Sequence, residues 1–254
     1  MNRDGDRCIA VMQPYVFPYI GYFQLVASVD RFVFLDDVNY IKKGWINRNR
    51  IVANGQEFLF TIPLERMSQN KLICETMISA DTSWKGKFLK TVERSYVKAP
   101  FFEHTYDAVR TMIGCETRVL SEFAENTIVY LSSMFGLSVK FLKASEYGNC
   151  SLRGEQRIVD ICVREKATRY HNAIGGMELY RSDSFMVKGI ELSFIKPCLI
   201  SYAQATGDFL KGLSIIDVMM YNSVDAIKAM LCSYESVRPD IGSRNGAEPV
   251  SCVE

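Results

Sequence analysis

The chain opens with alternating apolar and polar stretches that predict a strand, a helix and a second strand. Residues 8–12 are all apolar, which is typical of a strand covered on both faces. Residues 19–29 space their apolar side chains as a helix does, and residues 31–35 contain a second short apolar run. Together they have the length of a right-handed βαβ unit with parallel strands.

A β-hairpin is predicted next in the chain. Asn54-Gly55 separates two segments of strand character, residues 46–53 and 56–64, and Asn-Gly favours a tight hairpin turn. Because side chains alternate along a strand, Arg48 and Arg50 are expected on one face. Residues 71–79 are predicted to add a further strand.

The middle and the end of the chain continue the pattern with helices and strands. Helical spacing and stop residues predict helices over residues 83–96, 101–113, 118–135 and 155–166, and two short helices within 213–230 that meet near Asn222. Further strands are predicted over residues 139–142 and 168–171, with a loop over residues 173–180. Within residues 185–195, the alternating run 190–194 fits a half-exposed strand. The expected fold is α/β, with a mainly parallel, Rossmann-like sheet, the hairpin and a helical lobe over residues 83–136. We expect one domain over residues 1–235 and a flexible tail over residues 236–254.

Composition narrows the class of protein. The 254 residues are 48% hydrophobic and 23% charged, as in an ordinary globular protein, and the net charge of +1 argues against general polyanion binding. The eight cysteines form no CxxC pair, which favours reduced thiols over a zinc site or disulfide framework. Neither a secretory signal nor an apolar run of about 20 residues is visible. We therefore expect a soluble cytoplasmic protein.

Three polar residues follow the first two predicted strands. Ligands gather beyond the carboxyl ends of parallel strands, so Gln13, Asp36 and Asp37 are expected at one edge of the sheet. The two carboxylates are suited to hydrogen-bonding a ligand's hydroxyls or amine, to acting as a base, or to capping a local turn. Adjacent residues of an extended chain point to opposite faces, so one of the two is expected to face a shared pocket. Without a second carboxylate or histidine cluster nearby, a metal site is disfavoured.

Residues 40–50 combine four cations with two aromatic residues. Lys42, Lys43, Arg48 and Arg50 are interleaved with Tyr40 and Trp45, and no acid lies between residues 38 and 56. Arginine offers paired donors to phosphate, and aromatic rings stack on a base or sugar. The pattern favours recognition of a phosphate or diphosphate over a merely solvated hairpin. Single-stranded nucleic acid is the alternative ligand, made less attractive by the near-neutral total charge.

His171 is the candidate general base among the two histidines. It ends a predicted strand and precedes Asn172 and Gly175-Gly176, whereas His104 lies within a predicted helix. A lone histidine is more often structural, so the competing interpretation is a buried imidazole. Cys150 has no histidine at a recognisable spacing and is rejected as a nucleophile.

Several ordered blocks resemble the WbqC-like proteins, a family associated with bacterial O-antigen and surface-polysaccharide gene clusters. The blocks are QPYVFPYIGYFQL, FVFLDDVNYIKKGWINRNRI, FTIPL, NAIGGMELY, GIELSFIKP, YAQ and LSIIDVMMYN. The strand, Pro-rich loop and helix at the start are also similar to the nucleotidylyltransferase-like fold, with Tyr19 and Tyr22 where that family has histidines. The residues expected to bind substrate are Gln13, Tyr19, Tyr22, Asp36, Tyr40, Lys43, Trp45, Asn47, Arg48, Asn49, Asn172, Gly175, Gly176, Tyr202 and Gln204.

The resemblance implies a transferase that acts on a nucleotide-linked amino sugar. The expected reaction is transfer of an acyl or aminoacyl group, such as glycyl, to the sugar amine, with Asp37 and His171 as the catalytic residues. No cofactor is expected to be required. The expected partners are the nucleotide-diphospho-amino sugar and an acyl or aminoacyl donor, for which aminoacyl-tRNA is one candidate. Binding to a membrane is not expected, and a homodimer is one option for the oligomeric state. The alternatives are a glycosyltransferase of unusual fold and a non-catalytic nucleotide- or RNA-binding module.

Overall fold

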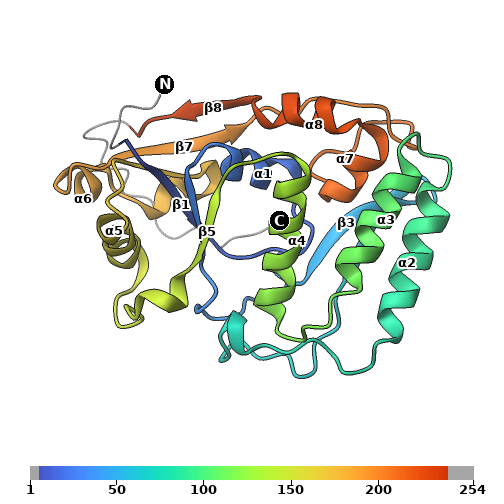
Figure 1. The fold of residues 1–254 in the computed structure, drawn as a ribbon, viewed down its shortest axis with the longest axis horizontal. Helices are drawn as coiled ribbons and strands as arrows, with labels where there is room; N and C mark the ends of the chain where they lie inside the picture. The colour runs from blue at the N-terminus through green and yellow to red at the C-terminus, as the bar shows by residue number, and fades with distance from the viewer. Residues whose placement is uncertain (1–5, 240–254) are drawn as a thin grey trace.

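The computed structural model describes residues 6–239, and a six-stranded sheet runs through them (Figure 1). Five strands are parallel and the last is antiparallel to its neighbour. In spatial order the strands are β5 (Lys140–Lys143), β2 (Arg31–Phe34), β1 (Cys8–Met12), β6 (Arg169–Ala173), β7 (Glu191–Pro197) and β8 (Tyr234–Val237). The predicted α/β fold with a mainly parallel sheet is confirmed.

Helices cover both faces of this sheet. Helix α1 (Ile20–Ala27) connects β1 to β2, and its Phe23 belongs to the same core as Ala10 and Phe32. Helix α5 (Gly154–Arg164) connects β5 to β6, and its Ile161 belongs to a second core that contains Ile9. Successive strand residues therefore enter different cores, which explains why the strands have continuous apolar sequences.

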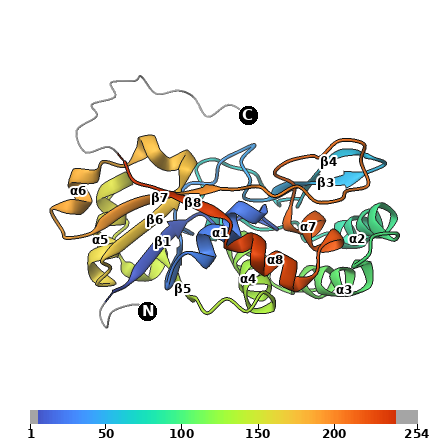
Figure 2. The ribbon, with the colours of Figure 1, turned by 90° about the horizontal axis from the view of Figure 1, so that it is seen from above.

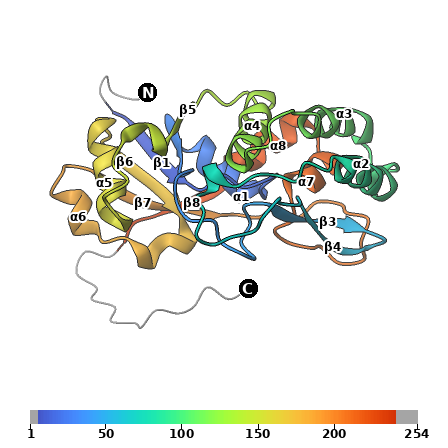
Figure 3. The same ribbon diagram turned by 90° about the horizontal axis from the view of Figure 1, so that it is seen from below.

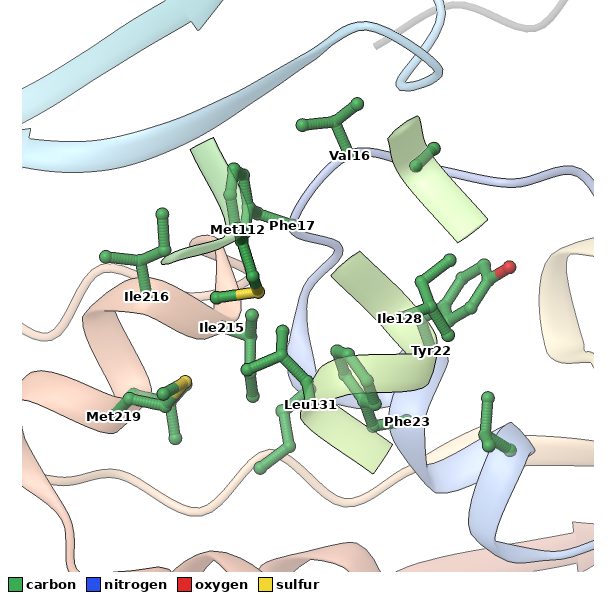
Figure 4. Packing of buried hydrophobic residues seen from close by; sticks show 14 of the residues in the cluster. Val16, Phe17, Tyr22, Phe23, Met112, Ile128, Leu131, Ile215, Ile216 and Met219 are labelled. Carbon is green, nitrogen blue, oxygen red and sulfur yellow. The ribbon is translucent and has the colours of Figure 1, made fainter. Parts of the chain in front are cut away.

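A group of helices occupies the end of the molecule opposite α5 and α6 (Ser182–Met186), as the view from above shows (Figure 2). The group contains α2 (Ser83–Tyr96), α3 (Phe102–Ile113), α4 (Leu120–Met134), α7 (Ile215–Tyr221) and α8 (Val224–Leu231). Close to α1, Leu131 of α4 lies beside Phe23, and both side chains are fully buried (Figure 4). Burying each such side chain stabilises the fold by about 1.5–3 kcal/mol. Helix α4 thus packs against α1, and its Glu125 also reaches the sheet directly through Lys143 of β5.

The predicted hairpin forms a separate two-stranded sheet. It consists of β3 (Arg48–Ala53) and β4 (Gln56–Thr61), joined at Asn54 and Gly55 with φ angles of 52° and 73°. Two positive φ angles are the geometry that the Asn-Gly turn predicts. From below, the hairpin again lies at the end of the molecule occupied by α2 (Figure 3).

Some predicted elements differ. Residues 71–79 form a short 3-10 helix, η1 (Ile73–Glu75), with isolated bridges around it in place of a strand. The predicted loop over residues 173–180 is largely a 3-10 helix, η3 (Ile174–Leu179). Strand β7 is buried at four consecutive positions because α1 and α6 pack against it, so the half-exposed prediction was wrong.

The boundary predicted for the C-terminal tail lies inside an element of the sheet. Strand β8 includes Ser236 and Val237, which had been assigned to the tail. Residues 240–254 of the predicted tail lie outside the described residues. The division into one domain and a tail at residue 235 stays a prediction.

Candidate functional site

The carboxyl ends of four neighbouring parallel strands bring polar residues into one row. In the order β5, β2, β1 and β6, these ends are followed by Ser145, Asp36-Asp37, Gln13 and Gly175. The connection from β1 passes over one face through α1, and the connection into β6 passes over the other through α5. A crevice at such a change of direction is the usual ligand site of a doubly wound sheet.

Asp36 joins two strands at this edge. Its carboxylate accepts hydrogen bonds from the Ser145 backbone N–H at 3.0 Å and from Ser145 Oγ at 2.7 Å. The side chain is buried, and both carboxylate oxygens have partners within the protein. Asp36 therefore connects the end of β2 to the segment after β5 by hydrogen bonds, a structural role that differs from the predicted contact with substrate.

Asp37 forms a buried ion pair with Arg157 of α5. Nη2 of Arg157 lies 2.6 and 2.7 Å from the two carboxylate oxygens of Asp37, and the two side chains are only 4% and 10% exposed. Arg157 Nε donates to Oδ1 of Asn149 at 2.9 Å. Nη1 of Arg157 is buried and has no hydrogen-bond partner among residues 6–239.

Arg157 is absent from the residues that the sequence predicted. Its partner Asp37 lies 120 positions earlier in the chain, so no local motif reveals the pair. The available signal is its place on α5, one position before Ile158 and four before Ile161, on the apolar face of an amphipathic helix. The two aspartates do face different partners, as the extended chain predicts.

The segment from residue 42 to 50, here named the basic loop, places two of its four cations close to one indole ring. The guanidinium carbons of Arg48 and Arg50 lie 5.6 and 5.1 Å from the centre of the Trp45 ring, so both arginines share a face as predicted. Lys42 and Lys43 are exposed beside them. Arg48 donates to the carbonyls of Gly44 and Lys43, which holds its side chain in place.

Arg50 is partly neutralised by a residue outside the predicted set. Its Nη1 lies 3.0 Å from Glu57 on the paired strand β4, and its Nη2 donates to the Gly212 carbonyl. Its Nε is buried without a partner in the described part of the chain. Among the described residues, Arg48 and the two lysines form no such ion pair and are therefore the cations of the basic loop with charge available for a ligand.

Three predicted ligand residues instead hold the basic loop in position. Tyr40 donates to Asn47 Oδ1 at 2.8 Å, and Asn47 Nδ2 donates to the carbonyl of Ile62. Asn49 Nδ2 donates to the carbonyl of Phe17 at 2.8 Å. All three side chains are buried, so the structure assigns them a positioning role in place of the predicted contact with substrate.

These bonds set the basic loop beside the carboxyl edge of the sheet. The loop after β1 contains Val16, whose N–H donates to the Ile46 carbonyl at 3.1 Å, and Phe17, which has a φ of 45°. Gln13 directly precedes this loop and is partly exposed. The loop that follows Gln13 is thus hydrogen-bonded to the basic loop, and a shared role of Gln13 and this loop in binding stays a prediction.

Tyr19 and Tyr22 belong to the packing around α1. Tyr22 is buried, burial raises the pKa of its hydroxyl, and this hydroxyl donates to the Gln13 carbonyl at 2.9 Å. Tyr19 is half-buried, and a Cβ atom placed on Gly21 would lie 2.3 Å from its ring. Tyr22 therefore helps to position the backbone of Gln13 through this hydrogen bond, a role that differs from the predicted direct contact with substrate.

His171 lies away from the carboxyl edge. It is in the middle of β6, and its Nδ1 is 3.1 Å from Oγ of Ser28. Ser28 follows α1 and precedes β2, which places it at the opposite, amino edge of the sheet. Burial lowers the pKa of His171 to about 4, with Arg169 lowering it further. The predicted catalytic role is therefore corrected to that of a buried, neutral imidazole.

Asn172 and the two glycines lie at the carboxyl end of β6. Asn172 Oδ1 accepts from the Ala173 N–H at 2.7 Å, and its side chain is buried. A Cβ atom on Gly176 would lie 3.0 Å from Asn172 Nδ2, so glycine allows the chain to pass close to this amide. Gly175 is exposed, with nothing within 4 Å of an added Cβ atom.

Tyr202 and Gln204 bind a second buried carboxylate. Asp217 accepts from Tyr202 at 2.7 Å and from Gln204 at 3.0 Å on one oxygen, and from Tyr96 at 2.7 Å on the other. Asp217 is fully buried, and burial raises its pKa against the opposing effect of these hydrogen bonds. Tyr96 also accepts from the Val52 N–H, so this cluster joins α2, α7 and β3. Tyr96 was not predicted.

Among residues 6–239, no group of three or more His, Cys, Asp or Glu side chains is arranged to hold a metal ion. Over the same residues, no helix is both long and apolar enough to cross a membrane.

Comparison with known proteins supports the resemblance seen in the sequence. The model of the WbqC-like protein family matches residues 13–229. The Mycobacterium tuberculosis (strain ATCC 25618 / H37Rv) protein named "Uncharacterized protein Rv1507c" is 26% identical over 221 residues, which cover 86% of this chain and 95% of that protein. No solved structure matches significantly.

Proposed function

This chain belongs to the WbqC-like protein family, and we propose that it is a transferase acting on a nucleotide-linked amino sugar. The proposed reaction is transfer of an acyl or aminoacyl group, such as glycyl, to the sugar amine during synthesis of a bacterial surface polysaccharide. The proposed location is the cytoplasm, and the acyl donor is an activated ester, an aminoacyl-tRNA being one example.

The observation that supports this proposal is the Trp45 ring with two guanidinium groups over it, beside the carboxyl edge of a parallel sheet. Guanidinium and ammonium groups bind the oxygens of a diphosphate, and an indole ring stacks on a base or sugar. In our proposal Arg48 and Lys43 bind the diphosphate, and Trp45 stacks on the nucleoside. Gln13, at the end of β1, then binds a sugar hydroxyl.

The chemistry requires a free amine and donors for an oxyanion. The amine nitrogen attacks the acyl carbonyl carbon, a C–N bond forms, and the alcohol of the donor leaves with its electron pair and the proton lost by nitrogen. Asp37, held by Arg157, orients the amine by accepting its hydrogen bond. None of these steps requires a cofactor.

No specific observation favours the alternative of a glycosyltransferase that holds a metal ion between Asp36 and Asp37. The Asp36 carboxylate is bonded to Ser145 and the Asp37 carboxylate to Arg157. The two groups therefore do not form a shared pair of metal ligands.

Calorimetric titration with uridine- and thymidine-diphospho-amino sugars tests the proposal. We expect saturable binding by the wild type and about tenfold weaker binding by Arg48→Ala, since a charge-assisted contact to phosphate is lost. Arg94→Ala is the matched control, because Arg94 is an exposed arginine of α2 far from the basic loop in sequence.

Two results would overturn the proposal. One is that none of these nucleotide sugars binds, and the other is that Arg48→Ala binds as tightly as the wild type. Steeply salt-dependent binding of single-stranded RNA, without affinity for nucleotide sugars, would instead identify a nucleic-acid-binding module.

A further inference from the structure

A cavity of about 330 Å³ lies beside the carboxyl ends of β2 and β5, where α4 packs against them. Its wall includes Phe34 from β2, Phe141 and Lys143 from β5, and Glu122 and Glu125 from α4. Glu146, in the 3-10 helix η2 (Ala144–Tyr147), completes the polar side. None of these residues was predicted to be functional from the sequence.

The polar side of the cavity carries an excess of negative charge. Lys143 Nζ lies 3.0 Å from Glu125 Oε2, so these two residues neutralise one another. Glu122 accepts a hydrogen bond only from the neutral hydroxyl of Thr117, at 2.6 Å, among the described residues. With three carboxylates and one ammonium group, the lining carries a formal excess of two negative charges.

Glu125 supplies a second and independent indication of a ligand. Only 4% of the residue is exposed, and its Oε1 has no hydrogen-bond partner among residues 6–239, although Oε2 binds Lys143. A buried carboxylate oxygen without a donor is costly and is therefore unusual in a folded protein. A donor entering the cavity would relieve that cost.

The remaining lining is largely apolar and includes Phe34, Phe141, Leu142 and Val129. The rings of Phe34 and Phe141 stack on each other with their centres 5.4 Å apart and their planes 7° apart. Apolar and aromatic side chains favour a short apolar body and a cation close to a ring. The cavity therefore combines carboxylate acceptors with an apolar lining.

We propose that this cavity binds a small molecule with a primary ammonium group, its N–H donors directed to Glu122, Glu125 and Glu146 and its apolar body against Phe34 and Phe141. An ammonium group has three N–H donors, which equals the number of carboxylates on the polar wall. This site is distinct from the basic loop and is independent of the proposed nucleotide sugar.

Titration calorimetry with 2-phenylethylamine, compared with its neutral N-acetyl derivative, tests the site. The wild type binds the amine and not the amide. Glu122→Gln, Glu125→Gln and Glu146→Gln each weaken amine binding about tenfold, as expected for loss of one charge-assisted hydrogen bond. The matched control Glu93→Gln, at an exposed position of α2, binds the amine like the wild type.

Two variants distinguish a loss of amine binding from a loss of folding and from a failure of the proposed nucleotide-sugar function. Glu146 is exposed, so Glu146→Gln reports on binding even where Glu125→Gln is unstable, and thermal unfolding identifies that case. Arg48→Ala keeps full affinity for the amine. The proposal is overturned by equal binding of amine and amide, by no binding of the amine, by unchanged affinity in Glu122→Gln and Glu146→Gln, or by displacement of the amine by magnesium chloride.

Discussion

At the scale of single residues, Arg157 forms a buried ion pair with Asp37 at the carboxyl edge of the sheet. Two charges have been removed from water, and their attraction repays that cost only while both are present. The pair also fixes Asp37 in one orientation, which a residue that orients an amine needs. Arg157 thus connects the stability of the sheet edge to the proposed chemistry.

Replacing Arg157 by Met is expected to lower the free energy of unfolding by about 3–5 kcal/mol, because Asp37 is left buried without a charged partner. Urea denaturation measures this loss. Adding Asp37→Asn to Arg157→Met is expected to restore part of it. As the control, Arg110→Met breaks an exposed pair with Asp107, at 65% and 66% side-chain exposure, and costs less than about 1 kcal/mol. An equally small loss for Arg157→Met would contradict the buried-pair interpretation.

His171 predicts the direction of one pH effect. Its pKa is lowered from 6.5 to about 4 in the folded protein, so between these values the unfolded chain binds a proton that the folded chain does not. The free energy of unfolding therefore falls as the pH falls, by about 2 kcal/mol from this group between about pH 7 and about pH 5.

Urea denaturation at the two pH values measures that effect. His171→Gln is expected to remove most of this difference, whatever its effect on stability at neutral pH. His104→Gln, at an exposed position of α3, is expected to retain it. An unchanged pH dependence in His171→Gln would show that other groups cause it.

At the scale of elements, the hairpin β3–β4 matters because the basic loop precedes it directly. The hairpin does not pair with the main sheet, and one buried amide, Asn49, ties its start to the loop after β1. Other bonds attach the same region: Val16 N–H to the Ile46 carbonyl, Ser214 N–H to the Arg50 carbonyl and Val52 N–H to Tyr96. The Asn49 amide is thus one of several contacts that position Trp45 and its two arginines.

Asn49→Ala is expected to lower the free energy of unfolding by about 1–3 kcal/mol, since the N–H of Arg50 loses its side-chain acceptor and the carbonyl of Phe17 keeps only the Ser214 hydroxyl as a side-chain donor. Faster amide hydrogen exchange in β3 is expected with it, and weaker binding of nucleotide sugar. Asn39→Ala, at an exposed position, is the control. Wild-type exchange rates in β3 would show that the hairpin is held by other contacts.

Local sequence patterns were sufficient for most elements. The apolar runs of β1 and β2 and the Asn-Gly turn predict their own geometry, because burial on both faces and positive φ angles each restrict the residue types. Residues 71–79 were misassigned because an extended segment without a partner strand has the same pattern as a strand. The burial of β7 depends on packing against α1 and α6, and the sequence of β7 alone does not predict that packing.

At the scale of the whole molecule, the site was predicted less completely than the fold. The order of the first elements correctly placed Gln13 and the aspartates after two neighbouring parallel strands, and their role in a site together with the basic loop stays a prediction. Arg157, Glu125 and Tyr96 were missed because each acts through a partner outside its own element: Asp37, Lys143 and Asp217. In a sequence, such a pair is indicated by a charged residue at a position on the apolar face of a predicted helix, as for Arg157 and Glu125.

The position of β1 in the sheet also has a consequence for synthesis on the ribosome. β1 pairs with β2 a short distance along the chain, but its other neighbour is β6, which ends only at Ala173. A nascent chain that has not yet reached that residue has its central strand exposed along one edge, where it can pair with other chains. The row of polar residues that includes Gln13 is complete only after β6 has emerged. The carboxyl edge is therefore finished late in synthesis, although its first residue is among the earliest made.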